Sequence, residues 1–334
     1  MNHQNYPPII YIPQHLEQSE HDDHQYIPEM MQSQDRIQWP ADMARRVTDA
    51  IRFQVQQMLD QSRLVRKSLG IRLMKPSDFV HCQVLGKGAF SQVSAVLVGD
   101  QTFACKHLKP ELMQQPEQFR TAAAELAYEA HILSSMDHPH ILKIRGWAEN
   151  GIASFDAGRH DSFFLLLDVL DETLDQRIQS WKVDDEYGSN NMVLLEKLRV
   201  LYEIASALHY VHEQGIVFRD LKPENIGFMG DSVQLFDFGL SRELPTLDTT
   251  TPYLMSGKVG TIWYMAPEVV VHQPYNVGAD VYSWSMVAYE VLIGEKPYSG
   301  LTPDLHSDSR TMSAREACVG ILFWGFRNHN FTLF

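Results

Sequence analysis

A short polar stretch near the middle of the chain constrains its fold and chemistry more than any other feature. Within VFRDLKPEN, residues 217–225, Asp220 precedes Asn225 by five residues and Lys222 lies between them. The stretch FDFGL follows, and its Asp237 comes twelve residues after Asn225. Asp220 can accept the proton of a hydroxyl group, and Lys222 can neutralise a phosphoryl group in transfer. Because Asn225 and Asp237 carry the hard oxygen atoms that Mg²⁺ prefers, the pattern predicts a site that holds metal-bound phosphates beside a reactive hydroxyl.

These two stretches resemble the catalytic loop and the metal-binding Asp-Phe-Gly segment of the eukaryotic protein kinases. Other stretches occur in the family's order, namely QVLGKGAFSQVSAVLVG from residue 83, FACKHL from 103, EAHILSSMDHPHI from 129 and GTIWYMAPE from 260. A single short motif could arise by chance, but several motifs in the family's order support the resemblance to the protein kinases. The resemblance covers residues 79–298 and implies an α+β, two-lobed fold.

The resemblance implies a small lobe of antiparallel strands with one helix, followed by a hinge, over residues 79–170. A larger, mainly helical lobe is expected over residues 171–298, with a buried helix that starts at Asp280 and is ended by Gly294 and Pro297. Seven apolar side chains of the helix 192–213 are expected to face the core, namely Leu194, Leu195, Leu198, Leu201, Tyr202, Ala205 and Leu208. The family's last helices have no recognisable counterpart in residues 299–334. We therefore expect an incomplete C-terminal lobe and a divergent tail, as in a splice variant or an inaccurate gene model.

The incomplete lobe is expected to lower stability. The buried arginine that pairs with Glu268 in the family has no identifiable counterpart, and Arg315 and Arg327 are the candidate substitutes. Loss of one partner of a buried ion pair costs about 3–5 kcal/mol, against a total stability of about 5–15 kcal/mol. We therefore expect the isolated chain to be poorly stable.

An ATP site in the small lobe follows from the same resemblance. Its glycine-rich turn lets the backbone approach phosphates closely, although Ser91 stands at the family's third glycine position. Lys106 is expected to hold the phosphates. Glu129 is its expected partner, and Glu125, one turn earlier, is the alternative.

Adenine recognition is implied for the hinge, where Leu167 corresponds to the gatekeeper and backbone groups read the base. The implied nucleotide-binding residues are Leu85, Gly86, Lys87, Gly88, Ala89, Phe90, Val93, Ala104, Lys106, Leu167, Asp168 and Leu170. Gly227 replaces the large apolar residue that usually lies under adenine, which would weaken nucleotide binding.

The implied reaction transfers the γ-phosphoryl group of Mg·ATP to a hydroxyl group of a protein substrate. The implied catalytic residues are Lys106, Glu129, Asp220, Lys222 and Asn225, and the implied Mg²⁺ ligands are Asn225 and Asp237. Thr261 and Lys222 favour Ser and Thr substrates. The whole string GTIWYMAPE looks most like that of the tyrosine-kinase-like group of these enzymes.

Control of activity is implied by the residue before Asp220. Family members with an arginine there, as Arg219 is here, commonly pair it with a phosphate on the activation segment. Phe218 replaces the histidine that the family usually has. The segment 237–268 holds six candidate phosphorylation sites, Thr246, Thr249, Thr250, Thr251, Tyr253 and Ser256.

The N-terminal region differs in composition from the rest. Residues 1–38 are rich in Gln, His, Pro and acidic residues, which predicts disorder, and the histidines at 3, 15, 21 and 24 are expected to be solvated. Residues 40–70 form a predicted amphipathic helix, with Val47, Ile51, Val55, Met58 and Leu59 at helical spacing. This helix either packs on its own domain or recruits a partner.

The charge and cysteine content of the chain restrict the partners and the cellular compartment that we expect. The net charge of −14 disfavours nucleic-acid and anionic membrane partners. The three cysteines show no metal-like spacing, and with no signal peptide or spanning segment visible we expect a soluble, cytoplasmic signalling protein. The rival interpretation is a non-catalytic, pseudokinase-like scaffold or binding module. A small-molecule kinase of related fold is disfavoured because several protein-kinase motifs occur together.

Overall fold

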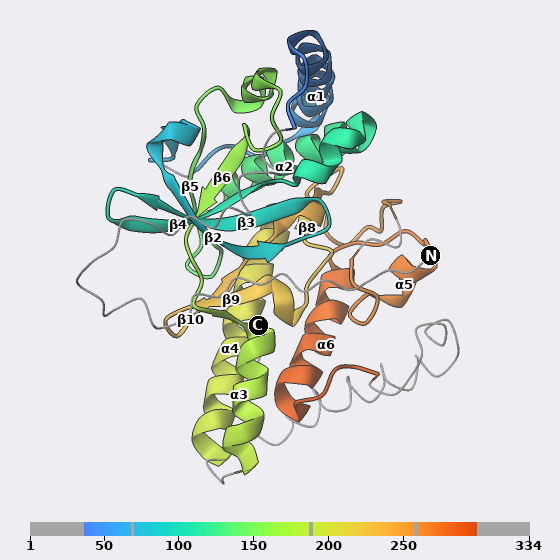
Figure 1. Ribbon diagram of the computed structural model, residues 1–334. Helices are drawn as coiled ribbons and strands as arrows, with labels where there is room; N and C mark the ends of the chain where they lie inside the picture. The colour runs from blue at the N-terminus through green and yellow to red at the C-terminus, as the bar shows by residue number, and fades with distance from the viewer. Residues whose placement is uncertain (1–36, 68–69, 187–189, 257–259, 299–334) are drawn as a thin grey trace, which may run out of the picture. The chain divides into compact units, whose positions relative to one another are not determined.

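The computed structural model describes residues 37–67, 70–186, 190–256 and 260–298 (Figure 1). The chain divides into two compact units, Met1–Asp137 with Leu142–Glu172, and His138–Ile141 with Thr173–Phe334. The first is built around a β-sheet and the second is mainly helical, so the expected α+β, two-lobed fold is confirmed. Predictions for residues 1–36 and 299–334, including most of the segment 1–38 and the divergent tail, fall outside the described residues. Residues 37 and 38, at the end of the segment predicted to be disordered, are described, and Gln38 donates from its side chain to the Ala157 carbonyl at 2.8 Å.

The first unit contains a six-stranded sheet in the order β1-β5-β6-β4-β3-β2. Its strands are β1 (Arg72–Met74), β2 (Val80–Lys87), β3 (Ser91–Val98), β4 (Gln101–Leu108), β5 (Ile144–Ala148) and β6 (Phe164–Leu167). Paired strands are antiparallel except β1 and β5, which are parallel. Strand β1 is only three residues long, too short to show the alternating pattern from which a strand is predicted.

Helix α2 (Pro116–Ser135) is the single helix expected within the small lobe, and it contacts β4 and β5. Pro116 occupies its first turn, where a missing N–H group is tolerated. Every residue from Ala122 to Met136 is buried or half-buried. The 3₁₀ turns η2 (Pro76–Asp78), η3 (Pro110–Gln114) and η4 (Gly151–Ala157) complete the described part of this unit.

Helix α1 (Ala41–Gln61) packs on the first unit, in contact with α2 and η4. The expected continuation of this helix to residue 70 is wrong. The backbone becomes extended at Ser62, where ψ is 138°. The Oγ atom of Ser62 accepts the N–H group of Leu64, so this side chain replaces the backbone acceptor of a further helical turn.

The described part of the second unit is dominated by α3 (Leu174–Glu186), α4 (Asn190–Glu213) and α6 (Gly278–Ile293), with the shorter α5 (Pro267–Val270). A three-stranded sheet has the order β10-β9-β7, from β7 (Glu172–Thr173), β9 (Ile226–Met229) and β10 (Ser232–Leu235). Strand β8 (Ile216–Val217) pairs with β11 (Arg242–Glu243), and η5 (Pro223–Asn225) and η6 (Phe238–Leu240) are 3₁₀ turns.

The expected core face of α4 is partly wrong. Leu201 and Leu208 are buried, but Leu194, Leu195, Leu198 and Tyr202 are exposed. The buried positions are instead Val193, Lys197, Val200, Leu201, Ile204, Ala207, Leu208 and Val211. Leucine occurs on both sides of this helix, so apolar content alone could not identify the face that the neighbouring elements cover.

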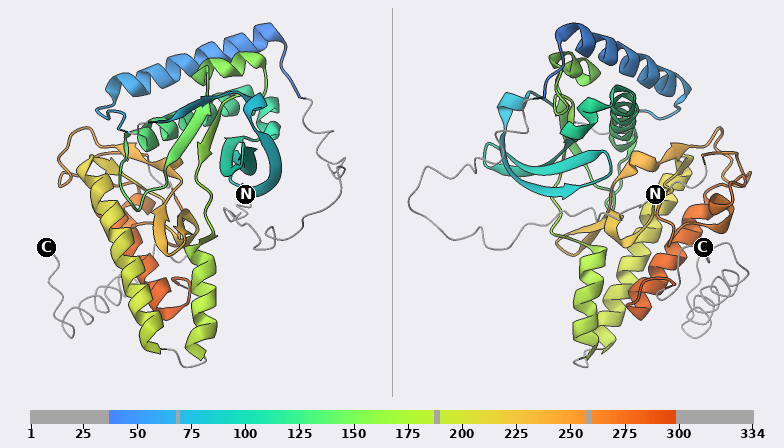
Figure 2. Two further views of the ribbon diagram at one scale, coloured as in Figure 1. Left: turned by 90° about the vertical axis from the view of Figure 1, so that its left-hand side faces the viewer. Right: turned by 45° about the vertical axis from the view of Figure 1, so that its right-hand side comes forward.

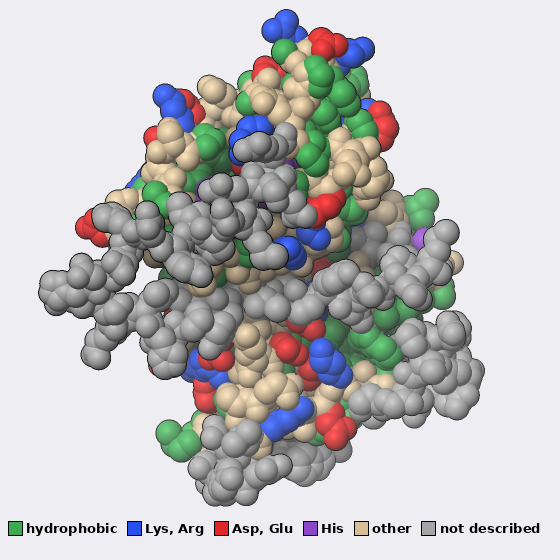
Figure 3. All heavy atoms as spheres, viewed as in Figure 1, with side chains coloured by type: hydrophobic (Ala, Val, Ile, Leu, Met, Phe, Trp, Pro, Cys, Tyr) green, Lys and Arg blue, Asp and Glu red, His purple; other side chains and the backbone are tan. Residues whose placement is uncertain are grey.

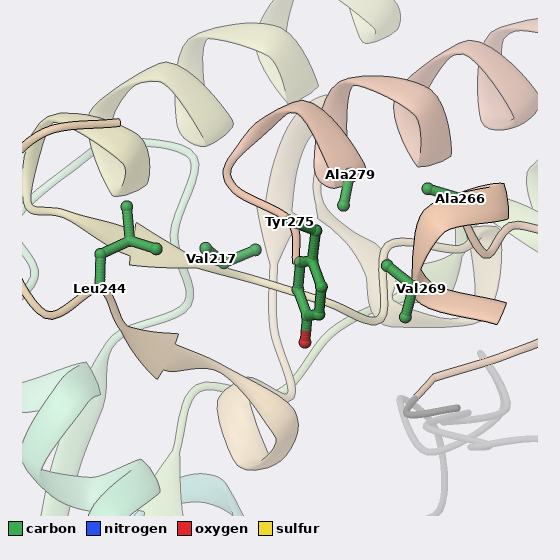
Figure 4. Close-up of a cluster of buried hydrophobic side chains, with 6 residues drawn as sticks. All are labelled: Val217, Leu244, Ala266, Val269, Tyr275 and Ala279. Carbon is green, nitrogen blue, oxygen red and sulfur yellow. The ribbon is translucent and has the colours of Figure 1, made fainter. Parts of the chain in front are cut away.

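A small cluster of buried side chains connects the shorter segments of the second unit to α6. It consists of Val217, Leu244, Ala266, Val269, Tyr275 and Ala279 (Figure 4). These residues come from β8, the residue after β11, α5 and its preceding residue, the loop after α5, and α6. Segments far apart in sequence are thereby fixed against the start of α6.

Surface charge is mixed on the face seen in Figure 3, where blue and red side chains of the described residues are interspersed. The chain carries 28 Lys and Arg and 42 Asp and Glu residues, so acidic side chains predominate overall. None of the helices in the described ranges is long and apolar enough to cross a membrane.

Helix α6 contains a buried carboxyl group. Glu290 is almost fully buried and accepts a hydrogen bond of 2.5 Å from the hydroxyl group of Tyr264. Burial raises the pKa of Glu290 from 4.5 to about 7, although the Tyr264 bond and Lys296 act against the shift and Glu224 and Asp175 add to it. The protonated form of Glu290 therefore fits the folded protein better than the carboxylate.

We predict that Glu290→Gln removes a pH-dependent part of the stability. Because the pKa is raised by folding, the contribution of Glu290 is complete below about pH 4.5 and is lost as the pH rises through about 7. Between pH 5 and 8 the wild-type free energy of unfolding should fall by on the order of 2 kcal/mol more than that of the variant. Urea denaturation at several pH values measures this difference.

Glu111→Gln is the control, because Glu111 is an exposed acid in the first unit. Parallel pH profiles for Glu290→Gln and the wild type would contradict the prediction.

Candidate active site

Cross-strand pairing gathers the predicted nucleotide-binding residues of the first unit on one side of the sheet. Val93 lies opposite Gly86 on β2 and opposite Lys106 on β4. Ala104, two residues before Lys106, lies opposite Leu167 on β6. Directly opposed residues, and residues two apart on one strand, share a face. Val93, Ala104, Lys106 and Leu167 therefore lie on a common face.

The glycine-rich turn connects β2 and β3. The Gly88 N–H group donates to the carbonyl oxygen of Ser91 at 2.8 Å. A Cβ atom on Gly88 would lie 3.2 Å from the Ser91 hydroxyl oxygen, closer than most such contacts, so the turn has little room for a side chain at position 88. The side chains of Lys87 and Phe90 are exposed in this turn, whereas Leu85 is buried.

The turn is also tied to the end of β4. The Lys109 N–H group donates to the Phe90 carbonyl oxygen at 3.0 Å, and Lys109 Nζ donates to the Ala89 carbonyl oxygen at 3.3 Å.

Lys106 forms a buried ion pair with Glu129 on α2. Its Nζ atom lies 2.7 Å from both carboxylate oxygens. Glu129 is therefore the partner that the structure brings to Lys106, while Glu125 is half-buried one turn earlier on the helix. Each buried charge needs its partner, because loss of either would leave the other uncompensated.

The hinge residues are fixed by an ion pair that the sequence did not suggest. Both carboxylate oxygens of Asp168 accept hydrogen bonds of 2.7 Å from Arg145 on β5. This hydrogen bonding raises the pKa of Arg145, against the effect of its partial burial. Asp168 N–H donates to the Lys143 carbonyl at 3.4 Å, and the side chains of Leu167 and Leu170 are buried.

In the second unit, η5 places Asn225 against Asp220. The Asn225 amide nitrogen donates to the backbone carbonyl and to Oδ2 of Asp220, both at 2.9 Å. Lys222 Nζ lies 2.9 Å from the same Oδ2. Burial raises the pKa of Asp220, and nearby Asp237 adds to the rise, while Lys222 and Thr261 act against it.

Thr261 completes the contacts of Asp220. Its N–H group and its hydroxyl group both donate to Asp220 Oδ1 at 2.9 Å. The same hydroxyl oxygen accepts a hydrogen bond of 2.8 Å from Lys222. Thr261 therefore makes the contacts with Asp220 and Lys222 that its position in GTIWYMAPE predicts.

Asn225 and Asp237 fit a divalent cation. Asn225 Oδ1 is fully buried and has no hydrogen-bond partner among the described residues, and such an atom is expected at a ligand site. Asp237, which has a left-handed backbone with φ of 62°, offers a carboxylate near Asp220. No three His, Cys, Asp or Glu side chains within the described ranges are arranged for a metal. Mg²⁺ would therefore need phosphate and water as further ligands.

Asp280 at the start of α6 holds the backbone of the catalytic loop. Its fully buried carboxylate accepts the N–H groups of Phe218 at 2.7 Å and Arg219 at 2.8 Å. His212 Nε2 lies 2.9 Å from the same carboxylate. The Phe218 ring packs edge-on against Phe238 at a centroid distance of 5.0 Å, so Phe218 has a packing role here.

Arg219 connects the catalytic loop to the activation segment. Its Nε atom donates to the Leu240 carbonyl at 2.6 Å, and its Nη1 atom donates to the hydroxyl groups of Ser256 at 2.8 Å and Tyr275 at 3.1 Å. Among the six candidate phosphorylation sites, Ser256 is the one that Arg219 contacts. Thr246 instead bonds to Tyr253, and both Thr250 and Thr251 bond to Asp248.

Glu268 at the end of the activation segment is half-buried, and its carboxylate makes no hydrogen bond or ion pair with another described residue. The candidate partners Arg315 and Arg327 lie outside the described ranges.

Gly260 lies unusually close to the catalytic loop. Its φ is +106°, and a Cβ atom would lie 2.5 Å from the carbonyl oxygen of Arg219. Gly230 also has a positive φ, +58°, but a Cβ atom there would meet nothing within 4 Å.

We predict that Gly260→Ala destabilises the protein clearly more than Gly230→Ala. Both substitutions force a side chain into a disfavoured conformation at about 1–2 kcal/mol, but only the methyl group added at position 260 would overlap backbone. We expect a total loss of about 3 kcal/mol or more for Gly260→Ala. Equal losses in urea denaturation would show that the close approach is not limiting.

Comparison with known families matches residues 79–321 to the protein kinase domain. Ribosomal protein S6 kinase alpha-6 of Danio rerio is 32% identical over 238 residues, 69% of this chain and 29% of that protein. G protein-coupled receptor kinase 2 of Drosophila melanogaster is 30% identical over 221 residues, 65% of this chain and 28% of that protein. A probable serine/threonine-protein kinase of Dictyostelium discoideum is 27% identical over 241 residues, 71% of this chain and 16% of that protein.

This chain thus spans less than a third of each of these relatives. The matched domain nevertheless covers residues 79–321 of its 334 residues. The chain belongs to the protein kinase family.

Proposed function

We propose that this chain is a protein serine/threonine kinase that transfers the γ-phosphoryl group of ATP to Ser or Thr hydroxyl groups of protein substrates. The observation that carries the proposal is the arrangement around Asp220, whose carboxylate is oriented by Asn225, Lys222 and Thr261. Names of relatives that include ribosomal protein S6 kinase and probable serine/threonine-protein kinase support the substrate class.

Asp220 accepts or orients the proton of the attacking hydroxyl group. Lys222, already beside Asp220, neutralises charge on the phosphoryl group during transfer. The raised pKa of Asp220 favours its protonated form relative to an ordinary aspartate, but proximity and electrostatics contribute most in a loose phosphoryl-transfer transition state.

Each unit offers its own residues for the cofactors. Lys106, held by Glu129, would bind the phosphates of ATP, and the face that carries Val93 and Ala104 would contact the adenine. Asn225 and Asp237 would hold Mg²⁺, which would neutralise phosphate charge. The buried, unpartnered Oδ1 atom of Asn225 supports its assignment as a ligand.

Finer assignments extend the proposal. Contacts of Thr261 with Asp220 and Lys222 support a preference for Ser and Thr over Tyr, and the GTIWYMAPE string supports the tyrosine-kinase-like group. The free thiols of Cys82 and Cys105 support a reducing, cytoplasmic setting, where the chain would act in phosphorylation signalling.

A second candidate function is a non-catalytic binding module. It is favoured by the exposed apolar side chains of α4, Met192, Leu195 and Tyr202, because exposed apolar surface commonly serves protein interaction.

The deciding experiment measures Mg·ATP turnover with a basic protein substrate, followed by identification of the phosphorylated amino acid. We predict that Asp220→Asn lowers turnover by about 10²–10⁴-fold and retains nucleotide binding, because the variant keeps the fold but loses the proton acceptor. Asp231→Asn, in an exposed turn of the same unit, is the control and should match the wild type.

Undiminished turnover in Asp220→Asn would reject the role of Asp220. A wild-type protein that binds ATP without turnover would favour the binding module, and phosphotyrosine as the product would reject the Ser/Thr preference.

We further propose Ser256 as the activating phosphorylation site. A phosphate on Ser256 would convert its neutral contact with Arg219 into a stronger, charge-assisted one. After incubation with an activating kinase extract and Mg·ATP, Ser256→Ala should have turnover about tenfold below the wild type. Thr249→Ala, on the same segment but without a contact to Arg219, is the control, and equal turnover of the two variants would contradict the assignment.

A further inference from the structure

Residues 38–67 precede the part of the chain that matches the protein kinase domain. The N-terminal end of this segment is anchored to the first unit. The indole N–H group of Trp39 donates to the Met113 carbonyl on η3 at 3.0 Å. The ring of Trp39 packs edge-on against Phe119, in the first turns of α2, at a centroid distance of 4.7 Å. Trp39 is itself buried, so this end of the segment inserts into the unit.

Backbone contacts between Trp39 and the residues after η4 add to this anchor. The Trp39 N–H group donates to the Gly158 carbonyl at 2.9 Å. Gly158 has φ of +70°, and a Cβ atom there would lie 2.7 Å from the Trp39 carbonyl oxygen. Beside them, Gln38 donates from its side chain to the Ala157 carbonyl at 2.8 Å. The residues after η4 are therefore shaped to receive this part of the chain.

Between its ends, the segment packs α1 against α2 and η4 (Figure 2). The buried positions of α1 are Ala44, Thr48, Ile51 and Val55, whose spacing defines a single stripe. The opposite face carries exposed charged residues and Phe53, which is 66% exposed. The helix thus presents one apolar face to the unit and one face to solvent.

The other end of the segment holds the C-terminal turns of α2. Ser62 Oγ lies 2.8 Å from Nε2 of His131, and the Lys67 N–H group donates to the Ser134 carbonyl at 2.9 Å. The guanidinium group of Arg66 lies 4.4 Å from the ring centroid of Trp147 on β5, close enough for a cation–π interaction. This end therefore contacts α2 and the sheet together.

Glu129 lies between the two anchors. Phe119 is ten residues before it on α2, and His131 is two residues after it. Because helix displacements of about 1–2 Å are typical of regulated interfaces, such a shift of α2 would break the 2.7 Å contacts between Glu129 and Lys106. A segment that holds both ends of α2 controls these contacts.

We infer that residues 38–67 form a brace that positions α2, and through it Glu129, at Lys106. Trp39 and Ser62 act as positioning residues at the two ends of this brace. The effect of the brace on phosphoryl transfer rests on the proposed kinase function, whereas its effect on the order of α2 does not. The N-terminal segment is thus part of the machinery that sets the Lys106–Glu129 pair.

The test combines Trp39→Leu, which removes the indole donor and keeps apolar volume, with Ser62→Ala, which removes the hydroxyl group that meets His131. Hydrogen exchange of the full chain, read by mass spectrometry, should be faster in the double variant by about fivefold or more over residues 126–135. Phe53→Ala, on the solvent face of the same helix, is the control and should exchange as the wild type does.

Unchanged exchange over residues 126–135, together with lost protection of α1, would overturn the brace. If the double variant does not fold, Ser62→Ala alone decides, with an expected rise of about twofold over the same residues and no rise as the contradicting result. These measurements hold whether or not the protein proves to be a kinase.

If the wild type shows turnover, a double-mutant cycle with Glu129→Gln tests whether the brace affects turnover through Glu129. We expect the brace variant to lower kcat/KM for ATP about tenfold in the wild-type background and to have little further effect when Glu129 is already replaced. Additive losses would show that the segment acts on turnover by another route.

Discussion

The buried carboxylate of Asp280 is the contact on which the catalytic loop depends. It accepts two consecutive backbone N–H groups, those of Phe218 and Arg219, and Arg219 is held at a positive φ of 72°. A non-glycine residue in that conformation costs about 1–3 kcal/mol, so the surroundings must enforce it. Because Asp280 begins the long helix α6, a rigid element sets the backbone from which Asp220, Lys222 and Asn225 extend.

A second rigid arrangement occurs in the first unit. Here the pairing of strands, and not a buried acid, fixes the positions of the candidate nucleotide-binding residues. Opposed residues on β2, β3, β4 and β6 bring Gly86, Val93, Lys106, Ala104 and Leu167 to one face. Glu129, in contrast, comes from helix α2. The position of this helix does not follow from hydrogen bonds between strands, which explains why additional contacts on α2 matter.

Much of the site could be predicted because its residues are close in sequence. Asp220, Lys222 and Asn225 lie within six residues, and a local turn fixes their geometry. The partner of Lys106 was also predictable, since the run from Glu129 to the following His-Pro turn resembles the family's run and distinguishes Glu129 from Glu125. The Arg145–Asp168 pair and the insertion of Trp39 could not be foreseen, because no motif in the sequence relates Arg145 to Asp168 or Trp39 to Met113. The buried face of α4 was also predicted wrongly. Leucine occurs on both sides of this helix, so the face that is buried depends on which neighbouring elements pack against it.

The buried Oδ1 atom of Asn225 has a thermodynamic consequence. An acceptor that is withdrawn from water without a partner lowers stability by about 1–3 kcal/mol, and this atom has none among the described residues. A ligand that binds it satisfies the acceptor in the folded chain alone, since the unfolded chain presents no such site. Binding of the proposed Mg²⁺ at Asn225 would therefore link folding to ligand concentration through one amide oxygen, and the fraction of folded molecules would rise with the supply of that cation.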